Sequence, residues 1–155
     1  MKYLVFFTLS VAAFLSGCES MSSRVHDRFA AVPPQTRTFA ANRRAVFSAG
    51  QVAVKNVGLL LGHKSLDQGV IEAYAPIRSG DATSDTRQTT LEIRLTDTDD
   101  SGTQVALLVS EHTEGDFPGG VSEQDLREHS LYQMYFAALE QVLLENGSIK
   151  APVNP

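Results

Sequence analysis

The fold of this chain is decided by the stretch Thr89-Thr90-Leu91-Glu92-Ile93-Arg94-Leu95-Thr96. Its apolar residues, beginning with Leu91, fall at every second position, and polar or charged residues stand between them. Successive side chains of a strand point to opposite faces of a sheet, so this alternation predicts a half-buried strand. The domain is therefore expected to be built around a sheet with one buried and one solvated face.

Two further segments on either side of this stretch also predict strands. Residues 68–77 alternate, with Ile71 and Ala73 on one face and Glu72 on the other. Residues 104–112 are more apolar, and the acidic turn 97–102 joins them to the central strand as an antiparallel hairpin. A polar stretch, residues 78–87, is expected to connect the first two strands. The expected sheet is three-stranded and antiparallel.

Amphipathic helices are predicted before and after these strands. Apolar residues recur every three to four positions from Asn42, a good N-cap, to Gly62, a residue suited to a left-handed helix end. A second helix is expected to begin at Ser122, where Asp125 completes an approximate capping box, and to end at Gly147. Residues 42–147 thus predict an α+β domain, ordered helix, three strands, helix, in two layers with both helices on one face.

The amino-terminal residues have the layout of a secretory signal peptide. Lys2 precedes an apolar run of about thirteen residues, which is shorter than the roughly 20 needed to span a bilayer. The run ends in Leu15-Ser16-Gly17-Cys18, which resembles the lipobox of bacterial lipoproteins. The resemblance implies a diacylglyceryl group and a palmitate on Cys18, cleavage between Gly17 and Cys18, and a signal peptide spanning residues 1–17.

The lipobox resemblance also bears on localisation and on the segment that follows. Glu19 stands where an aspartate would direct retention in the inner membrane, so the outer membrane, periplasmic face, is the expected destination. Residues 18–41 are expected to be a lipidated tether within which residues 35–40 permit a short edge strand. Residues 148–155 are expected to be a flexible tail. Cys18 is the only cysteine of the chain, which excludes an intrachain disulfide or a zinc–thiolate cluster.

Charge is distributed unevenly along the chain. Residues 19–64 hold seven Lys or Arg and two acids, whereas residues 65–155 hold five and sixteen. The basic half could draw the tether to an anionic membrane surface, or the asymmetry could be a solvated feature without consequence. Because the body of the domain is acidic, nucleic acid is not an expected partner.

The order of elements over residues 42–146 resembles the helix-grip domains of accessory lipoproteins in the outer-membrane β-barrel assembly machinery, and small uncharacterised lipoproteins. The resemblance rests on element order and apolar spacing. It has no signature residues, so it implies an accessory role without assigning any functional residue.

Two polar segments are candidates for chemical sites. The turn 97–102 matches the first half of a calcium-binding loop, but the closing glutamate would fall at Leu108, which favours an acidic hairpin turn. His112, Glu114 and Asp116 could contact a metal or act in hydrolysis, but no second histidine stands at helical spacing, which favours a solvated acidic loop over residues 111–120. No catalytic residue, metal or cofactor is predicted.

Aromatic residues are the candidates for contact with a partner. Phe117 stands in a glycine-rich loop. Tyr132, Tyr135 and Phe136 occupy neighbouring helical positions that are not all expected to point inward, so Tyr132 and Tyr135 are further candidates. The sequence favours a non-enzymatic, membrane-anchored accessory module that binds an envelope protein. The alternative is a periplasmic carrier of a lipid or small apolar ligand.

Overall fold

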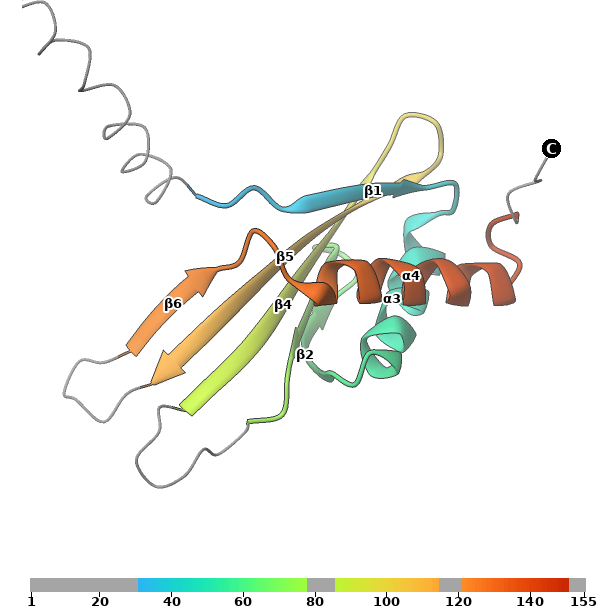
Figure 1. Ribbon diagram of the computed structural model, residues 1–155. Helices are drawn as coiled ribbons and strands as arrows, with labels where there is room; N and C mark the ends of the chain where they lie inside the picture. Colours follow the sequence, from blue (N-terminus) through green and yellow to red (C-terminus); the bar gives the residue numbers. More distant parts are fainter. Residues whose placement is uncertain (1–30, 78–85, 115–120, 151–155) are drawn as a thin grey trace, which may run out of the picture. The chain divides into compact units, whose positions relative to one another are not determined.

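The computed structural model describes residues 31–77, 86–114 and 121–150, which form an antiparallel sheet and two helices (Figure 1). The elements, in chain order, are β1 (Gln35–Phe39), α3 (Arg43–Asn56), β2 (Leu60–Ser65), β3 (Val70–Tyr74), β4 (Thr86–Asp97), β5 (Thr103–Glu114), β6 (Val121–Asp125) and α4 (Ser130–Glu145).

The sheet has six strands and an unusual edge. Its order is β1-β5-β4-β3-β2, and β6 also pairs with β5. Strand β4 pairs with the whole of β5, so β1 and β6 share the opposite edge of β5, one after the other. Strand β1 pairs with residues 103–107 of β5 and β6 pairs with residues 110–114. The β1–β6 edge is therefore interrupted near Leu108 and Val109.

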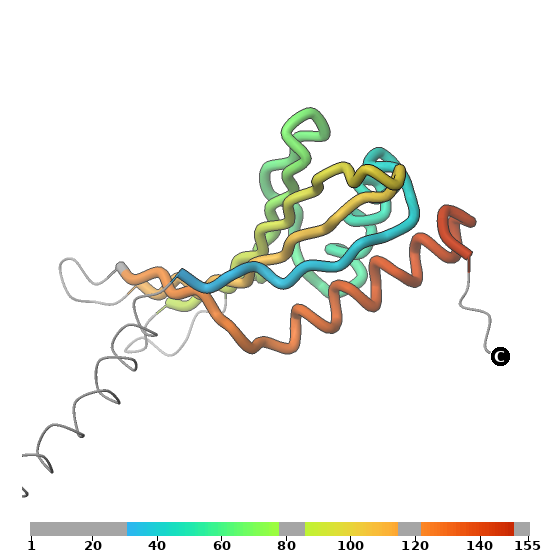
Figure 2. The backbone as a smooth tube through the Cα atoms, turned by 90° about the horizontal axis from the view of Figure 1, so that it is seen from above, coloured from blue at the N-terminus to red at the C-terminus, as the bar shows by residue number. Residues whose placement is uncertain are grey.

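Both helices pack on one face of the sheet (Figures 1 and 2). The register places Ile71, Ile93 and Leu107 in one row across β3, β4 and β5, and all three are fully buried. Alternate residues such as Glu92 and Arg94 lie on the helix-free face. Within the described residues, no helix combines the length and apolar character needed to cross a bilayer.

Local sequence explains where the helices begin and end. The Asn42 side chain accepts a hydrogen bond from the Ala45 amide (2.9 Å), which is the predicted N-cap. Helix α4 is capped by His129, whose Nδ1 accepts from the Leu131 amide (3.2 Å). It ends before Gly147, whose φ of 65° is the left-handed conformation that suits glycine.

The predicted three-stranded sheet was wrong, and β2 is the first reason. Leu60 and Leu61 continue the apolar spacing of α3, so the helix was predicted to run to Gly62. The helix instead ends at Asn56, because Gly58 takes a φ of 82° and turns the chain. Residues 60–65 then pair with β3 as an edge strand.

The second predicted helix started too early, which hid β6. Ser122 and Asp125 form no capping box, because they belong to β6, which pairs with β5. The predicted loop 111–120 was also too long, because β5 extends to Glu114. Strand β4 likewise begins at Thr86, inside the predicted connection 78–87.

Candidate binding sites

Two of the aromatic residues predicted to contact a partner, Tyr132 and Tyr135, are in the core. Tyr132, Tyr135 and Phe136 are each no more than 1% exposed. They stand at positions i, i+3 and i+4 of α4 and share one helix face, so the expectation that they could not all point inward was wrong. Their burial leaves neither tyrosine available to a partner. Gly17, Cys18 and Phe117 lie outside the described residues.

Tyr132 fills the interruption between β1 and β6. Its hydroxyl accepts a hydrogen bond from the Val109 amide (3.1 Å) and donates one to the Leu126 carbonyl (2.7 Å). The Leu126 amide in turn donates to the Val109 carbonyl (2.8 Å). One helical side chain thus satisfies the strand backbone at the point where neither edge strand reaches it.

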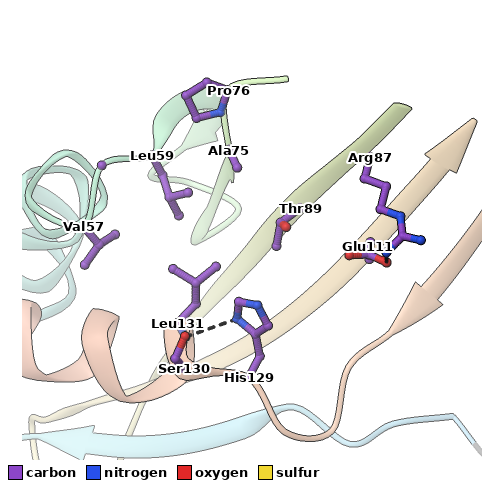
Figure 3. Close-up of a pocket in the computed structure, with 11 residues that line it drawn as sticks. Val57, Leu59, Ala75, Pro76, Arg87, Thr89, Glu111, His129, Ser130 and Leu131 are labelled. Atoms are coloured by element: carbon purple, nitrogen blue, oxygen red, sulfur yellow. Dashed lines mark hydrogen bonds and ion pairs between the residues drawn. The ribbon is translucent and has the colours of Figure 1, made fainter. Parts of the chain in front are cut away.

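A pocket opens where the helices stop and the sheet continues. Strands β4 and β5 have 12 residues each and are about 40 Å long, whereas α3 and α4, with 14 and 16 residues, are about 21 and 24 Å long. The helices therefore cannot cover the whole face. The α3–α4 pocket, of about 620 Å³, lies between the end of α3, the start of α4 and the uncovered sheet (Figure 3).

The α3–α4 pocket has an apolar side and a polar side. Figure 3 shows Val57 and Leu59 near the end of α3, the polar residues Arg87, Thr89 and Glu111 along the strands, and His129 and Ser130 at the start of α4. The apolar lining is Val57, Leu59, Ala75, Pro76 and Leu131. The polar lining is Arg87, Thr89, Glu111, His129 and Ser130. Such a surface suits a small amphipathic molecule better than a purely apolar one.

The charged groups of the α3–α4 pocket are only loosely paired. Arg87 Nη1 lies 4.0 Å from Glu111 Oε1, beyond hydrogen-bond distance, and the two side chains are 66% and 35% exposed. His129 Nδ1 is engaged as the acceptor that caps α4. In the neutral imidazole the proton must then lie on Nε2, and Figure 3 shows this nitrogen on the side of the ring that faces the sheet.

A second hollow, the β1 groove, runs along the outer edge of β1. It has a volume of about 770 Å³ and is lined by Arg37, Thr38, Phe39, Ala40, Glu140, Gly147, Ser148, Ile149 and Lys150. Arg37 fixes β1 over α4: its guanidinium lies 4.7 Å from the centre of the Phe136 ring and donates to Gln133 Oε1 (3.1 Å). The β1 groove is therefore bounded by a strand edge on one side and by the end of α4 on the other.

The backbone of β1 presents hydrogen-bonding groups to this groove. Val109 binds Tyr132 and Leu126 through its amide and carbonyl, so these groups face away from β4, and the same holds for every second residue of β5. Their β1 partners include Arg37 and Phe39, so the amide and carbonyl of Thr38 between them face outward. Within the described residues nothing pairs with them.

No protein-family model matches the sequence, and no curated protein matches it significantly. Among solved structures, the chain is similar to the crystal structure of a DUF4468 family protein from Bacteroides ovatus. The two share 11% sequence identity over 84% of this chain and 98% of that chain, with a TM-score of 0.33. At that TM-score the likeness supports no argument about function.

The polar segments that are candidates for chemical sites are spread over the sheet. His112 lies on β5 opposite Glu123 of β6, and the turn 97–102 closes the β4–β5 hairpin, with the Thr98 amide donating to the Gly102 carbonyl (3.0 Å). Across residues 31–77, 86–114 and 121–150, no three His, Cys, Asp or Glu side chains are placed to hold a metal ion. The groups that do converge, Arg87, Glu111 and His129, come from three elements and carry no sequence motif.

Proposed function

We propose that this chain is a lipid-anchored, non-enzymatic interaction module of the cell envelope, which binds an extended segment of a partner protein along β1. The observation that carries the proposal is the outward-facing backbone of Thr38 beside the 770 Å³ β1 groove. Peptides add to exposed sheet edges through main-chain hydrogen bonds, and adjacent pockets receive alternate side chains.

The groove offers both the backbone and the side-chain contacts that strand addition requires. A segment paired with β1 would direct alternate side chains toward α4, where Phe39 and Ile149 supply apolar surface. Arg37, Glu140 and Lys150 supply charges of both signs at its rim. An edge strand with a groove under it is better suited to a peptide than a flat edge, because the groove adds side-chain selection to the main-chain pairing.

The anchor part of the proposal rests on Leu15-Ser16-Gly17-Cys18 and on Glu19. Acyl chains on Cys18 would hold the domain at the periplasmic face of the outer membrane, since one chain binds reversibly and several bind stably. We expect Cys18→Ser to abolish incorporation of labelled palmitate and to move the protein from the membrane fraction to the soluble fraction. Unchanged fractionation of Cys18→Ser would contradict the anchor.

Thr38→Pro tests strand addition at β1. Proline removes the outward amide of Thr38 and leaves the bonds of Arg37 and Phe39 to β5 in place, and an edge strand tolerates it. Thr38→Val is the matched control, because it alters the side chain and keeps the amide. A photo-crosslinking residue at Lys150, in the groove, is expected to capture one partner in intact cells, and the yield should fall at least about tenfold in Thr38→Pro only.

Two outcomes of this experiment would count against the β1 groove. The first is equal capture by Thr38→Pro and the wild type. The second is the same captured band from a crosslinker at Met134, which is 48% exposed on α4 and does not line the groove.

A further inference from the structure

We propose that the α3–α4 pocket is a binding site for a small zwitterion with an apolar side group, the chemistry of an apolar amino acid. The site is distinct from the β1 groove, with which it shares no lining residue, and it does not depend on strand addition. Its volume of about 620 Å³ falls within the range of small-molecule sites, about 300–1,000 Å³.

The apolar end of the pocket is formed by side chains that the fold holds in place. Leu59 is 7% exposed and follows the Gly58 turn, where its amide donates to the Val54 carbonyl (3.0 Å). Ala75 is fixed at the end of β3, where its amide donates to the Thr89 carbonyl (2.8 Å). Leu131 approaches from the first turn of α4 (Figure 3). This wall is preformed and suits a short branched aliphatic group.

The polar end combines one anion, one cation and a neutral donor within the same pocket. Arg87 of β4 and Glu111 of β5 are diagonal neighbours, since Glu111 lies opposite Thr89, and the 4.0 Å between their charged groups leaves each able to bind another group. Nε2 of His129 is the remaining donor, because Nδ1 is occupied by the cap of α4. A ligand carboxylate can therefore pair with Arg87 and His129, and a ligand ammonium with Glu111.

The arrangement selects for a molecule that carries both charges. A simple carboxylate would meet the like charge of Glu111, and a simple amine would meet the like charge of Arg87. Only a zwitterion satisfies both residues while its apolar group covers Leu59 and Leu131. Discrimination should thus depend on the two charges together, and removing either should weaken binding.

Three compounds that share a 3-methylbutyl group test this on the purified full chain. L-Leucine carries both charges, 4-methylpentanoate lacks the ammonium group, and 3-methylbutylamine lacks the carboxylate. Titration followed by ligand-observed NMR and calorimetry is expected to show leucine binding at least about tenfold more tightly than either analogue. Failure of leucine to bind at millimolar concentration, or equal affinity for leucine and 4-methylpentanoate, would overturn the proposal.

Variants locate the binding and separate it from damage to the fold. Ala75→Trp fills the pocket and should abolish leucine binding, whereas Thr96→Trp, on the exposed helix-free face, should not.

Glu111→Gln should lower leucine affinity about tenfold toward that of 4-methylpentanoate. His129→Asn keeps a good N-cap and removes Nε2, so it should weaken leucine binding without lowering the melting temperature. Wild-type affinity in both Ala75→Trp and Glu111→Gln would place the ligand elsewhere and refute the site.

Discussion

Tyr132→Phe is expected to lower the free energy of unfolding by about 2 kcal/mol or more, an effect that arises from one hydroxyl group. That hydroxyl binds the buried Val109 amide and the Leu126 carbonyl, at 3.1 and 2.7 Å, where β1 and β6 leave the edge of β5 unpaired. Phenylalanine fills the same space but leaves both backbone groups without a partner. An unsatisfied buried donor or acceptor costs about 1–3 kcal/mol.

Tyr135→Phe is the matched control, three residues away on the same face of α4. The Tyr135 hydroxyl is buried, and no hydrogen-bond partner for it exists among the described residues. Burial raises the pKa of this hydroxyl above its ordinary value of 10.0, so it stays neutral. Removing it should leave stability unchanged or raise it by up to about 1 kcal/mol.

Urea unfolding of the two variants against the wild type measures the difference. A loss in Tyr132→Phe with none in Tyr135→Phe would show that the hydroxyl bridge holds the split edge together. Equal losses in the two variants would instead show that both hydroxyls contribute only through packing.

Where the sequence carries a local signal, the prediction agrees with the structure. The alternation of residues 89–96 lies inside β4, and Asn42 caps α3. Each depends on a short-range feature. In β4 it is the alternation that decides which face of the strand is buried, and at Asn42 it is a side chain that accepts a hydrogen bond from an unpaired amide of the first helical turn. Such interactions are encoded within a few residues of each other.

The missed strands are those in which a local signal favoured a helix. Leu60 and Leu61 keep the helical spacing of α3, and only the left-handed turn at Gly58 separates them from it. Ser122 and Asp125 have the spacing of a capping box, yet β6 is a polar edge strand whose stability comes from pairing with β5. Ser122 pairs with Thr113 and Asp125 with Ser110, nine and fifteen positions away (122 − 113 and 125 − 110), so pairing with another strand overrides the local preference.

The candidate sites were beyond sequence reasoning for the same reason. Arg87, Glu111 and His129 meet because β4 and β5 extend beyond the helices. The ends predicted for β4, β5 and α4 differ from the observed ends, so the predicted lengths do not reveal the uncovered part of the sheet. The burial of Tyr132, Tyr135 and Phe136 is different, because their i, i+3, i+4 spacing was sufficient to predict one shared face.

Gly69→Ala is expected to cost about 3 kcal/mol or more, because glycine is required there twice. Gly69 has a φ of 67°, which costs a residue with a side chain about 1–2 kcal/mol. A Cβ at this position would also lie 2.5 Å from the Leu95 carbonyl oxygen, a backbone atom of the neighbouring strand. Relief of that contact requires β3 and β4 to separate, which weakens the bond from the Leu95 amide to the Gly69 carbonyl (2.7 Å).

The turn that contains Gly69 has little freedom to move away. Arg43 of α3 donates hydrogen bonds to the carbonyl oxygens of Leu66 and Asp67, at 3.0 and 3.1 Å, and so ties the turn to the helix layer.

Gly58→Ala is the control, because Gly58 has a φ of 82° but no atom lies within 4 Å of an added Cβ. It should lose only about 1 kcal/mol, the cost of the backbone conformation alone. The difference between the variants in urea unfolding therefore isolates the contact with Leu95, and faster exchange of the Leu95 amide in Gly69→Ala would locate it. Equal losses of stability in the two variants, with the Leu95 amide still protected from exchange, would contradict the prediction. They would show that β3 and β4 accommodate the added Cβ without losing this hydrogen bond.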